Sequence, residues 1–129
     1  MNDTQAIQTL IEEWSKAVRD GNIEGILAHH SNDFVMFDVP PPFKSVGLEE
    51  YKKTWDTFFT WSPEPRVFNF TDMHIEAGNE VAFVFATGHC AGKNKEGVIE
   101  PLDFRLTMGL RKINGAWTIV HEHHSIPAE

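Results

Sequence analysis

The chain has 129 residues, which suffices for one domain with a hydrophobic core but not for two domains of ordinary size. Its formal net charge is −8 with His neutral, and Lys and Arg form no cluster, which argues against binding to a nucleic-acid backbone. The sequence has no apolar run near the ~18 residues of a membrane span, no signal-peptide pattern at its start, and one cysteine, Cys90. We therefore expect a cytoplasmic protein with no nucleic-acid or membrane partner.

The first half of the chain predicts helices around one strand. Thr4 can cap a helix that starts near Gln5, and Asp20-Gly21-Asn22 is typical of a helix end. Between these signals, apolar residues recur at helical spacing, at Ile7, Leu10, Ile11, Trp14, Ala17 and Val18. We expect the further elements over residues 23–30 (helix), 34–39 (strand, ended by the prolines at 40–42) and 47–59 (helix).

The second half predicts an antiparallel sheet. Ala77-Gly78-Asn79 and Asn114-Gly115 are typical hairpin turns, the latter of type I′. The expected strands cover residues 66–76, 80–91, 102–112 and 116–126. Helices followed by a run of antiparallel strands indicate an α+β domain rather than an alternating α/β one.

Two stretches carry a resemblance to a known family. They are Phe37-Asp38-Val39-Pro40 and Trp117-Thr118-Ile119-Val120-His121-Glu122-His123, supported by Trp14, Gly21, Asp33, Gly47, the run 103–107 and Pro127. The sequence resembles the SnoaL-like proteins, ketosteroid isomerase homologs of the nuclear transport factor 2-like (NTF2-like) superfamily. The resemblance covers nearly the whole chain, so residues 1–129 are expected to form a single SnoaL-like domain. It implies a cone of N-terminal helices packed on a curved antiparallel sheet, with a pocket inside and often a homodimer.

The resemblance also implies roles for individual residues. Asp38 is similar in position to the catalytic base of ketosteroid isomerases, and Pro101-Leu102-Asp103 resembles the segment that carries their second, neutral carboxyl group. Trp14 and Trp55 stand where those enzymes have tyrosines. Because an indole can donate one hydrogen bond but cannot accept one or relay a proton, the sequence departs from the steroid isomerase mechanism.

Strand alternation gives two interpretations of Asp38. Phe34, Met36 and Asp38 share one face of their strand. If this face points into the cone, Asp38 is a carboxylate among apolar groups, as suits a general base. Alternatively, Asp38 caps the turn that follows the strand.

The strand at 102–112 has one polar and one apolar face. Asp103 and Arg105 lie on the polar face with Thr107, and the apolar face consists of Leu102, Phe104, Leu106, Met108 and Leu110. In one interpretation the polar face lines the pocket and the apolar face contacts a second copy, which predicts a homodimer. In the other, Asp103 and Arg105 form a surface pair of little energetic value.

The last strand suggests two further polar site residues. Alternation places His121, His123 and Ser125 on one face with Trp117 and Ile119, and we expect that face to point inward. Two inward histidines suit acid–base chemistry. A His-x-His pair can also supply two metal ligands, but no third ligand is evident, so we expect no metal site.

We expect a cofactor-free acid–base enzyme, of isomerase, hydratase/dehydratase or hydrolase type, that acts on a small apolar oxygenated molecule. No phosphate-binding, flavin or serine-hydrolase motif is present, so no cofactor is expected. The candidate catalytic residues are Asp38, Asp103, His123, His121 and Arg105. The candidate substrate contacts are Trp14, Phe34, Met36, Trp55, Phe85, Trp117 and Ser125. The alternative is a non-catalytic ligand-binding or dimeric assembly module of the same fold.

Overall fold

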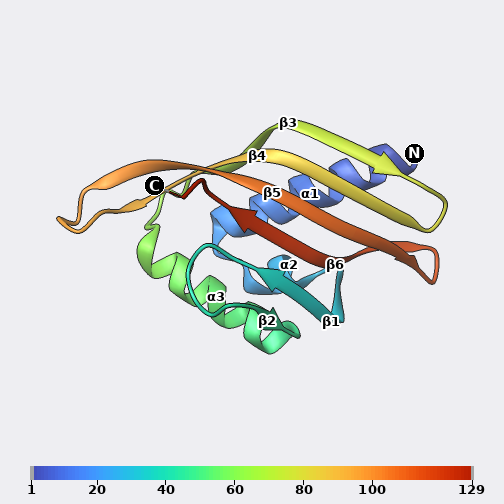
Figure 1. Cartoon of the computed structure of the whole chain (residues 1–129), viewed down its shortest axis with the longest axis horizontal. Coiled ribbons are helices and arrows are strands. Elements are labelled where there is room, and N and C mark those ends of the chain that lie inside the picture. Colours follow the sequence, from blue (N-terminus) through green and yellow to red (C-terminus); the bar gives the residue numbers. More distant parts are fainter. Residues whose placement is uncertain (1, 129) are drawn as a thin grey trace.

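A computed structural model describes residues 2–128 and shows helices packed on one face of a curved six-stranded sheet (Figure 1). The helices are α1 (Asp3–Asp20), α2 (Ile23–Leu27) and α3 (Leu48–Trp61). The strands are β1 (His30–Phe37), β2 (Ser45–Val46), β3 (Phe68–Ala77), β4 (Val81–Lys93), β5 (Ile99–Ile113) and β6 (Ala116–Ser125). Within the sheet the order is β2-β1-β6-β5-β4-β3, and only β1 and β6 pair in parallel. The predicted α+β class is confirmed.

Local signals explain where the first helix begins and ends. Asn2, not Thr4, is its N-cap: the Asn2 side chain accepts from the Gln5 backbone N–H, and the Gln5 side chain accepts from the Asn2 N–H. Gly21 ends α1 in the left-handed conformation, with φ of 69°. The apolar stripe predicted from helical spacing is buried against the sheet. No helix within residues 2–128 is long and apolar enough to cross a membrane.

The strands of the second half match the predicted ones to within a few residues. In the first half two predictions were wrong. The second helix ends at Leu27, because residues 30–33 already belong to β1. The two-residue strand β2 was not predicted; it pairs with β1 through Val35 and Met36 and returns the chain from the proline segment to α3.

The apolar face of β5 is the interior face of the sheet. Phe104, Leu106, Met108 and Leu110 are buried beneath the helices, whereas Asp103 is exposed on the opposite face. The interpretation in which this apolar face contacts a second copy is therefore wrong. The physical reason is that the sheet curves around the helices, so they cover the part of its concave side that carries these residues (Figure 1).

A β-bulge in β6 decides which residues of that strand point inward. Gly109 pairs with His121, but Leu110 pairs with Ile119, so Val120 is an extra residue in β6. Trp117 and Ile119 before the bulge are buried, as are Glu122 and His124 after it. His121, His123 and Ser125 therefore lie on the outer face, which corrects the prediction that they share the face of Trp117.

Glycines of β4 allow aromatic rings to pack directly on the inner face of the strand. A Cβ at Gly92 would overlap the Trp61 ring, and a Cβ at Gly88 would overlap the Phe104 ring. Trp61 lies at the end of α3, so this contact sets the position of the helix over the sheet. Aromatic side chains thus pack on β4 at both of these glycines.

We predict that Leu106→Ala lowers the free energy of unfolding by about 2–5 kcal/mol, because it leaves a cavity among buried side chains. The matched control is its neighbour Thr107→Ala, on the exposed face, which should change stability by less than about 0.5 kcal/mol. Denaturant unfolding of both variants measures the difference. Equal effects would show that the face of Leu106 is not the interior.

Candidate functional site

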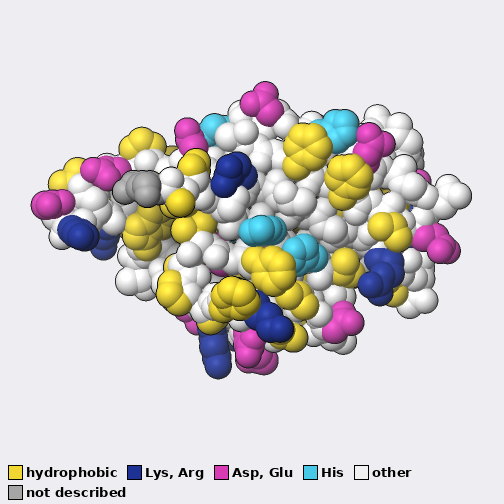
Figure 2. Space-filling model, viewed as in Figure 1, with side chains coloured by type: hydrophobic (Ala, Val, Ile, Leu, Met, Phe, Trp, Pro, Cys, Tyr) yellow, Lys and Arg dark blue, Asp and Glu magenta, His cyan; other side chains and the backbone are white. Residues whose placement is uncertain are grey.

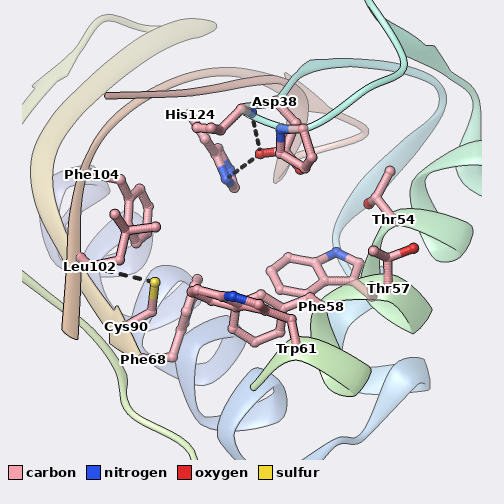
Figure 3. Close-up of a pocket in the computed structure, with 13 residues that line it drawn as sticks. Asp38, Thr54, Thr57, Phe58, Trp61, Phe68, Cys90, Leu102, Phe104 and His124 are labelled. Carbon is pink, nitrogen blue, oxygen red and sulfur yellow. Dashed lines mark hydrogen bonds and ion pairs between the residues drawn. The ribbon is translucent and has the colours of Figure 1, made fainter. Parts of the chain in front are cut away.

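A cavity of about 370 Å³ lies between α3 and the concave face of the sheet. Figure 3 shows Asp38 and His124 together on one side of it, facing Phe58, Trp61 and Phe68 across the space. The remaining lining residues are Val39, Pro40, Thr54, Trp55, Thr57, Cys90, Leu102 and Phe104. An apolar enclosure with a few convergent polar groups is typical of a small-molecule site.

Asp38 lies at the rim of the cavity, directly after β1. The prolines at 40–42 end the strand and turn the chain away, which leaves the carboxylate beside the last inward residue of β6. Its Oδ1 accepts a hydrogen bond from the Val39 backbone N–H (2.8 Å) and lies 3.6 Å from Nδ1 of His124. Asp38 therefore caps its own turn and also lines the cavity, so both predicted placements occur together.

The buried Glu122 side chain is hydrogen-bonded to His124. The Glu122 side chain is fully buried, and its Oε1 accepts from Nε2 of His124 at 3.0 Å. Its Oε2 accepts from Nε2 of His30 at 2.7 Å and from the Tyr51 hydroxyl at 2.9 Å. The Trp14 indole N–H in turn donates to the Tyr51 oxygen at 3.1 Å. We call these residues with Asp38 the buried polar cluster; it ends at the cavity, which His124 and Asp38 line.

The charges of the cluster follow from its hydrogen bonds. Burial alone would raise the pKa of Glu122, but the hydrogen bonds from His124 and His30 outweigh it and lower this pKa to about 2. Burial alone would lower the pKa of His124, yet its hydrogen bond to Glu122 and the negative charges of Glu122 and Asp38 raise it. Burial and the nearby Glu122 charge raise the pKa of Tyr51 well above 10.0, so its hydroxyl stays a donor. The cavity thus presents His124, with its raised pKa, beside Asp38.

Of the residues predicted from the sequence, Asp38 and Trp55 line the cavity. Trp14 lies beneath it, with its ring 6.1 Å from Trp55 and 6.3 Å from His124. Phe34 and Met36 are fully buried core residues that do not reach the cavity. Trp117 is buried at the start of β6, away from His124 at its end, and donates to Asp3.

The other predicted site residues lie on the outer face of the sheet, which corrects their placement in the pocket. Asp103 accepts from Nδ1 of His89 (2.9 Å), and Arg105 donates to Ser125 (3.0 Å). Two more residues predicted for the pocket, Phe85 and His121, also lie on this face. Asp103, Arg105 and Phe85 lie on the outer face because they alternate with buried neighbours along their strands. His121 and Ser125 lie there because of the bulge at Val120.

His123 also lies outside, but it borders a second, shallower hollow. That hollow is formed by Phe37, His123 and the segment 38–43. Asp38 lines it together with the inner cavity, so this short segment separates the two spaces. His123 thus lies near Asp38 without entering the apolar cavity.

Sequence reasoning missed His124, Glu122, Tyr51 and His30. Regular alternation predicts that Glu122 and His124 lie on the outer face, whereas the bulge turns their side chains to the inner face. Gly109, a glycine inside a predicted strand, was the signal that could have indicated a bulge. His30 was assigned to a helix end instead of the buried start of β1.

Cys90 lines the cavity without being a nucleophile. Burial, with the negative charges of Asp103 and Asp38, raises the pKa of its thiol to about 11, so the reactive thiolate is disfavoured. Within the described residues, His, Cys, Asp and Glu form no group of three placed to hold a metal ion.

Solved structures share this arrangement of helices and sheet, which is an NTF2-like fold. An NTF2-like protein of unknown function from Pseudomonas putida KT2440 is 30% identical, with a TM-score of 0.85 over 100% of this chain and 91% of that one. A ketosteroid isomerase-like protein from Erwinia carotovora atroseptica SCRI1043 is 20% identical, with a TM-score of 0.80 over 99% and 100%. A candidate dehydratase of the NTF2-like family from Streptomyces avermitilis is 14% identical, with a TM-score of 0.81 over 98% of each chain.

The SnoaL-like domain family matches residues 7–129, and the chain belongs to this family. Among the curated proteins, none matches the sequence. The family and the fold are thus shown, and the chemistry has to be argued from the cavity.

We predict that Glu122→Gln lowers the free energy of unfolding by about 3–5 kcal/mol near neutral pH, because it breaks a buried ion pair. The difference in the free energy of unfolding between wild type and variant should be largest between pH 4.5 and 6.5. These limits are the ordinary pKa values of a glutamate and a histidine side chain. Below 4.5 it should shrink, because the lowered pKa of Glu122 gives stability that is lost as pH falls. Above 6.5 it should also shrink, because the raised pKa of His124 gives stability that is lost as pH rises.

Chemical denaturation across this pH range measures the effect. Glu76→Gln is the matched control, since Glu76 also pairs with a histidine two residues away (3.1 Å) but is exposed. A Glu122→Gln effect as small as that of Glu76→Gln, or one independent of pH, would contradict the assigned charges.

Proposed function

We propose that this SnoaL-like protein is a cofactor-independent proton-transfer enzyme, of isomerase or dehydratase type, whose substrate is a small apolar molecule bearing an oxygen. The observation that carries the proposal is the adjacency of His124 and Asp38 at one end of a mostly apolar cavity. A base and an acid side by side can act on neighbouring atoms of one substrate.

The proposed chemistry uses each group in the state that its surroundings favour. Asp38, as a carboxylate, takes a proton from a carbon next to a carbonyl group. The electron pair of that C–H bond forms a C=C bond, and the π pair of the carbonyl group moves to its oxygen, which takes the Nδ1 proton of His124 to give an enol. In a substrate with a conjugating C=C bond, Asp38 then returns its proton to the far carbon while the enol O–H proton returns to His124, which completes an isomerisation. In a substrate with a β-hydroxyl, that group leaves as water with the proton held by Asp38 while the enol O–H proton returns to His124, which completes a dehydration.

The walls of the cavity support an apolar substrate. Phe58, Phe68, Phe104 and Trp61 surround the space opposite and beside the two polar groups (Figure 3). Aromatic walls exclude water, which strengthens the electrostatic contribution of His124. The names of the Erwinia ketosteroid isomerase-like protein and the Streptomyces candidate dehydratase are consistent with this reaction class. Their sequence identities to this chain, 20% and 14%, show a shared fold and not a shared reaction.

We predict that the protein accelerates ring opening of 5-nitrobenzisoxazole, in which a base removes the C–H proton while the N–O bond breaks to give a coloured phenolate. Asp38→Asn and His124→Gln should each reduce the rate at least about 100-fold, because each removes a positioned acid–base group. Absorbance of the product measures the rate.

Two neighbours on the outer face provide matched controls for this assay. Asp103→Asn and His123→Gln make the same chemical changes at exposed positions and should retain the wild-type rate. Loss of activity in the controls, or full activity in Asp38→Asn and His124→Gln, would contradict the proposed roles. Absence of catalysis with the probe bound would favour the binding-module alternative.

We further propose that the protein forms a homodimer through the outer face of the sheet. Phe83 and Phe85 are each 49% exposed on this face, with their rings parallel to within 16°. The His74 ring stacks on Phe85 at 4.8 Å. Figure 2 shows hydrophobic and histidine side chains gathered on the same face. Exposed aromatic side chains grouped in this way are typical of an interface.

We predict that Phe85→Asp converts a dimer of the wild-type protein into a monomer, because it buries an unpaired charge in each copy of the interface. Phe43→Asp is the control: Phe43 is 95% exposed but lies on the proline segment, off the sheet. Light scattering at micromolar concentration measures the mass. A monomeric wild-type protein, or a dimer disrupted only by Phe43→Asp, would contradict the interface.

A further inference from the structure

We propose that Glu122 is a positioning residue that keeps both ring nitrogens of His124 protonated and directs the Nδ1–H toward Asp38 and the cavity. The inference deepens the proposed function, because it assigns a role in that site to a residue that does not touch the cavity itself. Its structural part, the state of the His124 ring, stands whether or not the protein is an enzyme.

The first support is that Glu122 cannot turn away from His124. Both of its oxygens are occupied, Oε1 by His124 and Oε2 by His30 and Tyr51, and none of the side chain is exposed to solvent. The two partners of Oε2 are themselves fixed: His30 Nδ1 lies 3.0 Å from the Ala28 carbonyl oxygen, and the Tyr51 oxygen accepts from Trp14. Rotation of the carboxylate would leave several buried donors without partners.

The second support is the count of protons. His124 faces a carboxylate from each ring nitrogen, with Nε2 at 3.0 Å from Glu122 and Nδ1 at 3.6 Å from Asp38. A carboxylate only accepts hydrogen bonds, and a neutral imidazole carries a single N–H. The ring in this orientation therefore matches its two neighbours when both nitrogens carry protons.

The third support is that, within residues 2–128, the charged groups that act on the His124 ring are Glu122 and Asp38. Glu122 belongs to the same strand, and Asp38 follows β1. From β4, Cys90 stays a neutral thiol, and from α3, Tyr51 stays a neutral hydroxyl, because burial raises the pKa of each group. The Phe104 ring stacks on the imidazole at 5.6 Å, and neither this ring nor Trp14 titrates. The state of His124 thus depends on the two carboxylates, of which Glu122 is the more buried.

The chain contains a natural comparison for this pair. His74 and Glu76 have the same two-residue spacing on β3 and nearly the same Nε2–Oε1 distance, 3.1 Å against 3.0 Å for His124 and Glu122. The side chains of the β3 pair are 48% and 60% exposed, whereas those of the β6 pair are 9% and 0% exposed. Water screens the first pair, so the strong coupling is specific to the buried pair.

The experiment is a titration of His124 by NMR of a protein labelled at its histidine rings. In the wild-type protein, both ring nitrogens should remain protonated above the ordinary midpoint of 6.5. In Glu122→Gln the midpoint should fall by about one pH unit or more, the effect of losing a carboxylate in contact. The control Glu76→Gln should leave the His124 titration unchanged.

The same variants separate this inference from the proposed function. With 5-nitrobenzisoxazole, Glu122→Gln should shift the pH dependence of the rate in parallel with the His124 midpoint. Even if the protein does not catalyse this reaction at all, the NMR titration still tests the role of Glu122. If Glu122→Gln does not fold, the wild-type titration decides: a neutral His124 ring below pH 6.5 overturns the inference. An unchanged midpoint in a folded Glu122→Gln protein also overturns it.

Discussion

A buried carboxylate keeps its charge only when hydrogen-bond donors surround it, and the interior of this protein is arranged around one such group. Glu122 has no solvent exposure and receives donors from His30 at the start of β1, Tyr51 in α3 and His124 in β6. These segments are far apart in the sequence. The requirement to satisfy one carboxylate therefore ties helix, central strands and cavity wall into a single arrangement.

The bulge in β6 is what makes that arrangement possible. Without the extra residue Val120, alternation would turn His121 and His123 inward and expose Glu122 and His124. One inserted residue thus places Glu122 and His124 on the inner face of the sheet and His121 and His123 on the outer face. The inner face carries the acid–base groups of the cavity, and the outer face carries the aromatic and histidine side chains of the proposed interface (Figure 2).

Much of the fold could be predicted from the sequence, since periodic burial follows directly from apolar spacing, as in α1 and β5. Asp38 and Trp55 were indicated by the resemblance to ketosteroid isomerases, and both line the cavity; the register of β1 is regular from Val35 to Phe37, just before Asp38. His124 could not be predicted, because its direction depends on a bulge defined by pairing with Gly109 on another strand. The role of Tyr51 could not be predicted either, because it belongs to an apolar helical stripe and its position does not indicate its partner Glu122.

The proposed site binds an apolar ring with its polar atoms against Asp38 and His124. A crystal structure with indazole, a stable isostere of the benzisoxazole ring, tests this most directly. The indazole ring should lie against Phe58, Phe68 and Phe104, with a ring nitrogen within hydrogen-bond distance of Asp38 or His124. The proposed site would be contradicted if indazole bound only on the outer face of the sheet, or if it did not enter the cavity at a saturating concentration.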